Sequence, residues 1–166
     1  MKKTPKSSSC EYHTYFDYAD VLRHQGASIA VSESAAGGLI NAALVAVPGA
    51  SDFYRGGMIV YTGAGRRILA GNEALPEGLK GATEAFALVQ ANRSKNLYQA
   101  DWGIGETGAT GPSGNPYGDP PGVGWVACSG QLDATLRLQT ENDDRIANMH
   151  AFALAALQLA VETIRA

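Results

Sequence analysis

The chain has 166 residues, a net charge of −3 at pH 7 and 45% hydrophobic residues, which fits one globular domain with a sizeable core. An acidic balance gives no electrostatic case for nucleic-acid binding, where a basic face is expected. No apolar run approaches the roughly 18 residues that span a bilayer, and the polar start lacks the apolar stretch of a secretory signal. We therefore expect no nucleic-acid or membrane partner, a cytoplasmic location, a disordered tail over 1–10 and a single domain over 11–166.

Helix-like and strand-like patterns alternate along the chain, judged by apolar spacing and by Gly and Pro breaks. In chain order they predict a helix over 11–25, a strand over 28–32, a helix over 39–47, a strand over 58–62, a short helix over 66–69, a helix over 81–97, strands over 101–107, 123–128 and 132–139, and a helix from about 143 to 164. The last two strands lie close enough to form a hairpin. The alternation indicates a layered α/β domain with a mixed sheet.

Ser34 stands between the first predicted strand and the following helix, within Glu-Ser-Ala-Ala-Gly-Gly over 33–38. Its hydroxyl has two roles open. It is either an N-cap that accepts a hydrogen bond from the helix start, or a nucleophile whose developing oxyanion meets helix-terminal N–H groups. The same N–H groups, helped by Gly37 and Gly38, suit a phosphate. The segment is not a Gly-x-Ser-x-Gly elbow, so it does not indicate an α/β-hydrolase.

Two further segments carry polar groups at or after the ends of predicted strands. Tyr61 and Arg66 are either a half-buried strand tyrosine and a solvated arginine or a phenol and a guanidinium that line a polar site. Residues 108–122 hold too many Gly and Pro for a regular element, and a loop of that length is often functional. Its start, with Thr107, Gly108 and Gly111, forms either an anion-binding nest or a mobile surface loop.

Arg145 lies at the start of the last predicted helix, where it is either part of a surface ion pair or a bidentate ligand for phosphate. No cluster of His, Cys and carboxylate residues has metal-ligand spacing. We therefore expect no metal and no cofactor.

Five motifs in order resemble the CinA C-terminal domain family over about residues 28–163. They are Ser-Glu-Ser-x-x-Gly-Gly-Leu (32–39), Val-Pro-Gly-Ala-Ser-x-x-Tyr-Arg-Gly-Gly (47–57), Val-Tyr-Thr (60–62), Thr-Gly-Ala-Thr-Gly-Pro-Ser-Gly (107–114) and Pro-x-Gly-x-Gly-Trp-Val-Ala (120–127). The resemblance implies an α/β/α sandwich in three layers, with a mixed, mainly parallel sheet, and a homodimer. It also implies a nicotinamide mononucleotide amidohydrolase that releases ammonia and leaves nicotinic acid mononucleotide in pyridine nucleotide salvage. Longer members carry an N-terminal domain, and we expect this chain to be the stand-alone form.

The resemblance also assigns roles by position. Ser34 falls on the proposed nucleophile, Tyr61 and Thr107 on a conserved-motif tyrosine and threonine, and Arg145 on the arginine of Gly-Asp-Arg, with Asp144 in register. The expected catalytic residues are Ser34, Tyr61, Arg66 and Thr107, and the expected substrate-binding residues are Gly37, Gly38, Gly108, Gly111 and Arg145.

The chain departs from the family pattern at two positions. Ala36 stands in place of a threonine, and Arg66 in place of a lysine. A buried lysine can lose its proton and act as a base, whereas arginine stays charged in proteins. The base is then another group: Tyr61 as a phenolate beside Arg66, or a ligand-activated water. An amidase for a different substrate is one alternative, and a catalytically silent nucleotide- or phosphate-binding module is another.

Overall fold

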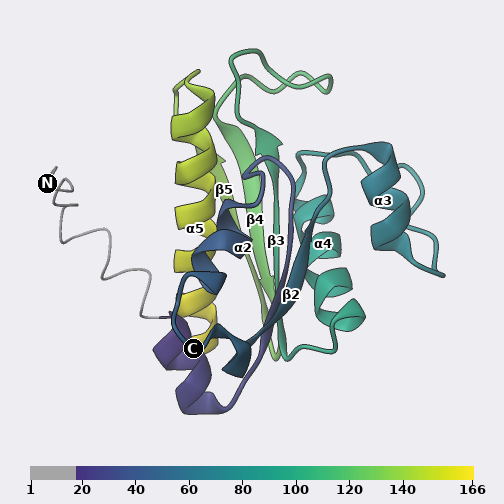
Figure 1. The fold of residues 1–166 in the computed structure, drawn as a ribbon. Coiled ribbons are helices and arrows are strands. Elements are labelled where there is room, and N and C mark those ends of the chain that lie inside the picture. Colours follow the sequence, from purple (N-terminus) through teal and green to yellow (C-terminus); the bar gives the residue numbers. More distant parts are fainter. Residues whose placement is uncertain (1–17) are drawn as a thin grey trace, which may run out of the picture.

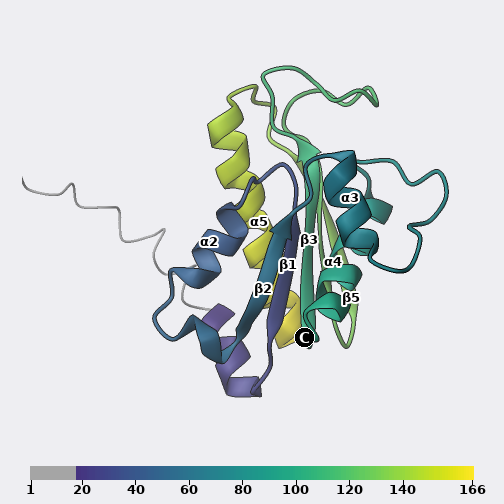
Figure 2. The ribbon, with the colours of Figure 1, turned by 45° about the vertical axis from the view of Figure 1, so that its right-hand side comes forward.

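A computed structural model of the chain describes residues 18–166, and Figures 1 and 2 show its fold. The strands are β1 (Ile29–Glu33), β2 (Tyr54–Ile59), β3 (Trp102–Ala109), β4 (Val123–Ser129) and β5 (Asp133–Gln139). The helices are α2 (Leu39–Val45), α3 (Gly63–Ala70), α4 (Glu84–Leu97) and α5 (Arg145–Arg165), with a short 3-10 helix, η1 (Ala50–Asp52). Residues 18–25 are also helical. The tail expected over 1–10, and residues 11–17 of the first predicted helix, lie outside the described residues.

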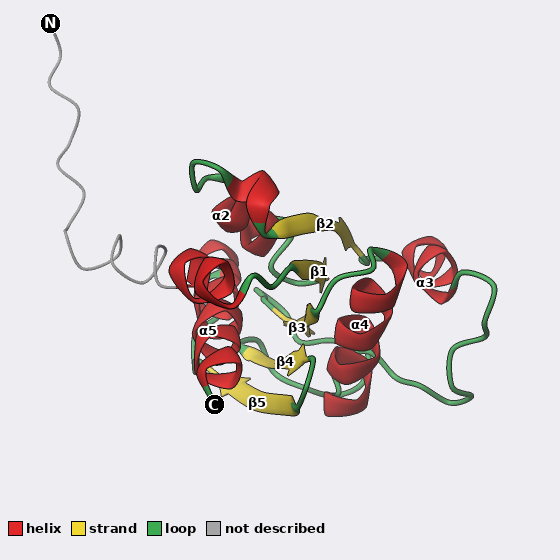
Figure 3. Cartoon of the chain, turned by 90° about the horizontal axis from the view of Figure 1, so that it is seen from below, coloured by secondary structure: helices red, strands yellow, loops and turns green. Residues whose placement is uncertain are grey.

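One five-stranded sheet, in the order β2-β1-β3-β4-β5, separates two layers of helices. Helices α2 and α5 cover one face and α4 covers the other, with α3 beside α4 (Figure 3). The larger apolar core lies on the α2/α5 side, where Ile104, Phe152 and Leu157 are buried. The predicted three-layer α/β/α architecture is confirmed. No helix within residues 18–166 is long and apolar enough to cross a bilayer.

Strand directions make the sheet mixed. β1 runs parallel to both β2 and β3, and β4 runs antiparallel to both β3 and β5. Four strands therefore point the same way and only β4 is reversed, as expected for a mixed, mainly parallel sheet. The carboxyl ends of β1, β2, β3 and β5 meet at one edge, the usual place for a ligand site in such a sheet.

The second strand differs from its prediction over 58–62, because it begins at Tyr54 and ends at Ile59. The predicted strand began directly after Gly56 and Gly57. Both lie inside β2. They are glycines because a side chain at either position would overlap a neighbour, which is the Tyr98 ring at Gly56 and Asn41 at Gly57. Tyr61 consequently lies beyond the strand, and the next residue, Thr62, caps α3.

Close packing also explains two glycines inside β3. A Cβ at Gly103 would overlap the backbone carbonyl of Ala91, and one at Gly105 would overlap that of Ala87. The glycines therefore let α4 approach the central strand.

Replacing Gly105 with alanine should lower the free energy of unfolding by about 3 kcal/mol, because α4 and β3 must move apart to admit a methyl group. Urea denaturation measures the change. Gly63→Ala is a suitable control, because the nearest atom to its Cβ would be the Arg67 Nη1 at 3.8 Å. A Gly105→Ala protein as stable as the control would contradict this account of the packing.

Candidate functional site

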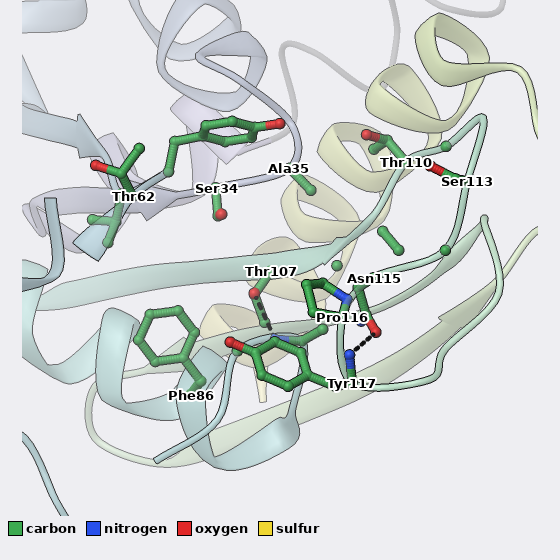
Figure 4. Close-up of a pocket in the computed structure, with 18 of the residues that line it drawn as sticks. Ser34, Ala35, Thr62, Phe86, Thr107, Thr110, Ser113, Asn115, Pro116 and Tyr117 are labelled. Carbon is green, nitrogen blue, oxygen red and sulfur yellow. Dashed lines mark hydrogen bonds between the residues drawn. The ribbon is translucent and has the colours of Figure 1, made fainter. Parts of the chain in front are cut away.

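A cavity of about 420 Å³ opens at the carboxyl edge of the sheet, between the β1 and β3 ends, α3 and the loop after β3. Seven of the nine predicted site residues line it: Ser34, Tyr61, Arg66, Thr107, Gly108, Gly111 and Arg145. Figure 4 shows the Ser34 side chain directed into this space, across from the rings of Phe86 and Tyr117. The fold thus gathers residues that are more than 100 positions apart in the sequence.

The Ser34 hydroxyl is not a helix cap. The N-cap of α2 is Gly38, which provides no side-chain hydrogen bond. Ser34 is half-buried, and within residues 18–166 its hydroxyl makes no hydrogen bond. This excludes the N-cap role and leaves the oxygen free to meet a ligand.

The backbone N–H groups around Ser34 face into the protein. The N–H groups of Ser34 and Ala36 both donate to one carboxylate oxygen of Glu106, each at 2.9 Å. Glu33 accepts the N–H of Asn41 at 2.9 Å and that of Ile40 at 3.2 Å, at the start of α2. The expectation that N–H groups of this turn bind an oxyanion or a phosphate is therefore wrong for these four, because the chain's own carboxylates occupy them.

Gly37 and Gly38 are not among the residues that line the cavity. Both have positive φ, +67° and +105°, a conformation that favours glycine. Each is also packed closely, since a Cβ on Gly37 would lie 2.8 Å from the Met149 Cε and one on Gly38 would lie 3.2 Å from the Ile59 Cδ1. This close packing shapes the turn, and the substrate-binding role expected for the two glycines stays a prediction.

Tyr61 pairs with Arg145 and not with Arg66. The Arg145 guanidinium donates to the Tyr61 hydroxyl at 2.8 Å and to the Gly111 carbonyl at 2.6 Å. Tyr61 is 61% exposed, so the alternative prediction that it is a half-buried strand residue was also wrong. Because Tyr61 lies past the strand end and turns toward α5, its hydroxyl pairs with Arg145, and the predicted pairing with Arg66 is absent among the described residues.

Arg66 also lines the cavity and is held by contacts of its own. Its guanidinium lies 4.1 Å from the centre of the Phe86 ring, within cation–π range, and donates to the Leu79 carbonyl at 3.1 Å. Thr107 is buried, and its hydroxyl accepts the Ala82 N–H at 3.1 Å. These contacts fix Arg66 and Thr107 in place.

The charge of the cavity is one-sided. Two guanidinium groups, those of Arg66 and Arg145, line it, and no Asp or Glu within residues 18–166 does. Such a lining favours an anionic ligand. Within residues 18–166, no group of three His, Cys, Asp or Glu side chains is placed to hold a metal ion.

The sequence matches the CinA C-terminal domain over residues 14–164. A CinA-like protein of Salinibacter ruber is 34% identical over 146 residues, which is 87% of this chain and 35% of that protein. One from Acidobacterium capsulatum is 35% identical over 83% of this chain and 34% of its own length. The chain belongs to the CinA C-terminal domain family. It spans about a third of the length of these two curated relatives.

Solved CinA structures share the fold. The competence damage-inducible protein A of Klebsiella pneumoniae superposes with a TM-score of 0.85 at 24% identity, over 93% of this chain and 96% of that one. The CinA superfamily protein of Escherichia coli gives 0.85 at 22% identity, over 97% and 95%. At these identities the likeness concerns the fold.

Two positions of this CinA domain have a structural role. Ala36 is fully buried in the apolar core and does not line the cavity, so the departure from threonine there removes no hydroxyl from the site. Asp144 is the N-cap of α5 and accepts the Ala147 N–H at 3.0 Å. It therefore begins the helix that carries Arg145.

Glu106 was missed in the sequence, although it lies directly below the Ser34 turn. It is fully buried, and one of its two carboxylate oxygens has no partner in residues 18–166. Burial raises the pKa of Glu106 to about 7 against the lowering effect of the Ala36 and Ser34 N–H groups, and the Glu33 carboxylate adds a smaller rise. An acidic residue inside a central strand of glycine and apolar residues was the signal available in the sequence.

The pKa of Glu106 makes a prediction about stability. Its value of about 7 in the folded protein lies above the ordinary 4.5, so the folded state holds the proton more tightly than the unfolded chain does. This contribution to stability is complete below about pH 4.5 and is lost as the pH rises through about 7, a fall of about 3 kcal/mol. Urea denaturation from pH 5 to 8 should show this fall in the wild type and not in Glu106→Gln. An equal fall in both proteins would sink the assignment.

Proposed function

We propose that this CinA-family chain hydrolyses the carboxamide of nicotinamide mononucleotide, giving nicotinic acid mononucleotide and ammonia. One observation carries the proposal: the Ser34 hydroxyl, which makes no hydrogen bond to the described part of the chain, opens onto a cavity that the same residues line with two guanidinium groups and no carboxylate. Nicotinamide mononucleotide has a carboxamide that the Ser34 hydroxyl can attack and a phosphate that a guanidinium group can bind. The family membership supports the same reaction.

In the proposed reaction, the Ser34 Oγ attacks the carboxamide carbon and forms a C–O bond. The C–N bond then breaks, ammonia leaves with the hydroxyl proton, and water hydrolyses the acyl-enzyme to the carboxylic acid. Arg66, fixed on Phe86, supplies positive charge for the developing oxyanion. Arg145, already paired with Tyr61, binds the phosphate, and the loop beyond Thr107 encloses the nucleotide.

No described side chain accepts a hydrogen bond from the Ser34 hydroxyl, and Tyr61 is engaged by Arg145. We therefore assign the proton relay to water held by the bound ligand. We also propose a cytoplasmic homodimer, a single domain over 11–166 and a place in pyridine nucleotide salvage for this chain.

The purified protein should release ammonia from nicotinamide mononucleotide, and Ser34→Ala should lower kcat by at least about a hundredfold because the nucleophile is removed. A coupled ammonia assay measures both. Ser51→Ala is the matched control, because Ser51 is exposed in η1, away from the cavity. An undiminished rate in Ser34→Ala removes Ser34 from the mechanism.

A catalytically silent ligand-binding module is the second candidate, and the charged arginine in place of a lysine base favours it. It predicts saturable binding of nicotinamide mononucleotide by calorimetric titration with no ammonia release. In that case Arg66→Lys should gain turnover, since a lysine can give up its proton. Turnover by the wild-type protein would exclude this candidate.

A further inference from the structure

A buried carboxyl group lies directly behind the residue proposed to react. Glu106 belongs to the central strand β3, one residue before the cavity-lining Thr107. Successive strand residues face opposite sides of a sheet, so Thr107 faces the cavity while Glu106 faces the other layer. There, a single Glu106 oxygen accepts the N–H groups of Ser34 and Ala36 at 2.9 Å each.

These two hydrogen bonds hold the backbone at Ser34 and two residues after it. The Ser34 side chain points into the cavity (Figure 4), whereas its N–H points away from it, toward Glu106. Ser34 is not a helix cap, and its hydroxyl has no partner of its own in residues 18–166. The direction of the hydroxyl therefore depends on how the 34–36 backbone is held.

We propose that Glu106 is a positioning residue for Ser34: its carboxylate holds the 34–36 turn from behind and so sets the direction in which the hydroxyl enters the cavity. The inference rests on the function proposed above. Glu106 does not line the cavity, so it acts through Ser34 and not on the ligand.

The surroundings of Glu106 make its grip depend on pH. Glu33 of β1 is the charged side chain that acts on it. β4 places the uncharged Val126 opposite it, α4 contributes the Gln90 amide, which donates to the Glu106 backbone carbonyl, and α5 brings Phe152 to the neighbouring strand position. The second Glu106 oxygen has no partner within residues 18–166. A proton can therefore add to this second oxygen without displacing a hydrogen bond. Protonation weakens the hydrogen bonds from the turn, because an ionised acceptor binds N–H groups more strongly than a neutral one.

The test compares kcat and KM for ammonia release between pH 5.5 and 8.5 in the wild type, Glu106→Gln and Glu106→Asp. Wild-type kcat should rise as Glu106 ionises near neutral pH. Glu106→Gln keeps an acceptor but no charge, so its kcat should lack that rise and lie about tenfold below wild type at pH 8.5, with KM changed less than twofold. Glu106→Asp keeps the charge but is one methylene shorter, so its kcat should fall as well.

Glu162→Gln, the same change on the exposed side of α5, is the control and should keep the wild-type profile. If Glu106→Gln also keeps that profile, Glu106 is a structural residue only and the inference is overturned.

Amide NMR on the wild-type protein provides a readout that requires no turnover and does not depend on whether a variant folds. In the wild type, the Ser34 and Ala36 amide protons should shift together as Glu106 titrates near neutral pH. Amide protons that do not move over this range would overturn the inference. If the amides titrate while nicotinamide mononucleotide releases no ammonia, the proposed substrate fails and the hold of Glu106 on the turn stands.

Discussion

The site depends on one constraint: buried backbone N–H groups at the end of β1 must find acceptors. Glu106 accepts from Ser34 and Ala36, and Glu33 accepts from the first N–H groups of α2. Two acidic side chains thus accept N–H groups at a helix start where a capping side chain is absent, since the N-cap of α2 is Gly38. Because they occupy the N–H groups from inside, the Ser34 side chain is what the turn presents to the cavity.

The remaining cavity walls come from separate elements that the sheet brings to one edge. Asp144 caps α5, and the guanidinium of the next residue, Arg145, then reaches both Tyr61 and Gly111. Asn148, on the same helix, donates to the Thr110 carbonyl at 2.9 Å. The start of α5 therefore anchors the glycine-rich loop after β3, which otherwise has no regular structure.

The two arginines of the cavity differ in the groups that hold them. Arg145 is joined to a phenol and a carbonyl, a set that leaves its positive charge unneutralised. Arg66 lies on an aromatic ring, which fixes its plane without cancelling its charge. The two arginines therefore favour an anionic ligand in the cavity, while the buried carboxyl groups of Glu33 and Glu106 lie behind the turn and outside the cavity lining.

The sequence by itself determined the alternation of helices and strands, the final hairpin and the α5 start, because these follow from local spacing, Gly and Pro breaks, and an acidic cap. Its ordered motifs also determined the family. Tertiary structure alone decided that Gly56 and Gly57 belong to a strand, that Tyr61 pairs with Arg145, and that Glu106 holds the Ser34 turn. Each of these contacts joins elements far apart in the chain, and local patterns carry no information about which distant atom fills a space or accepts a hydrogen bond.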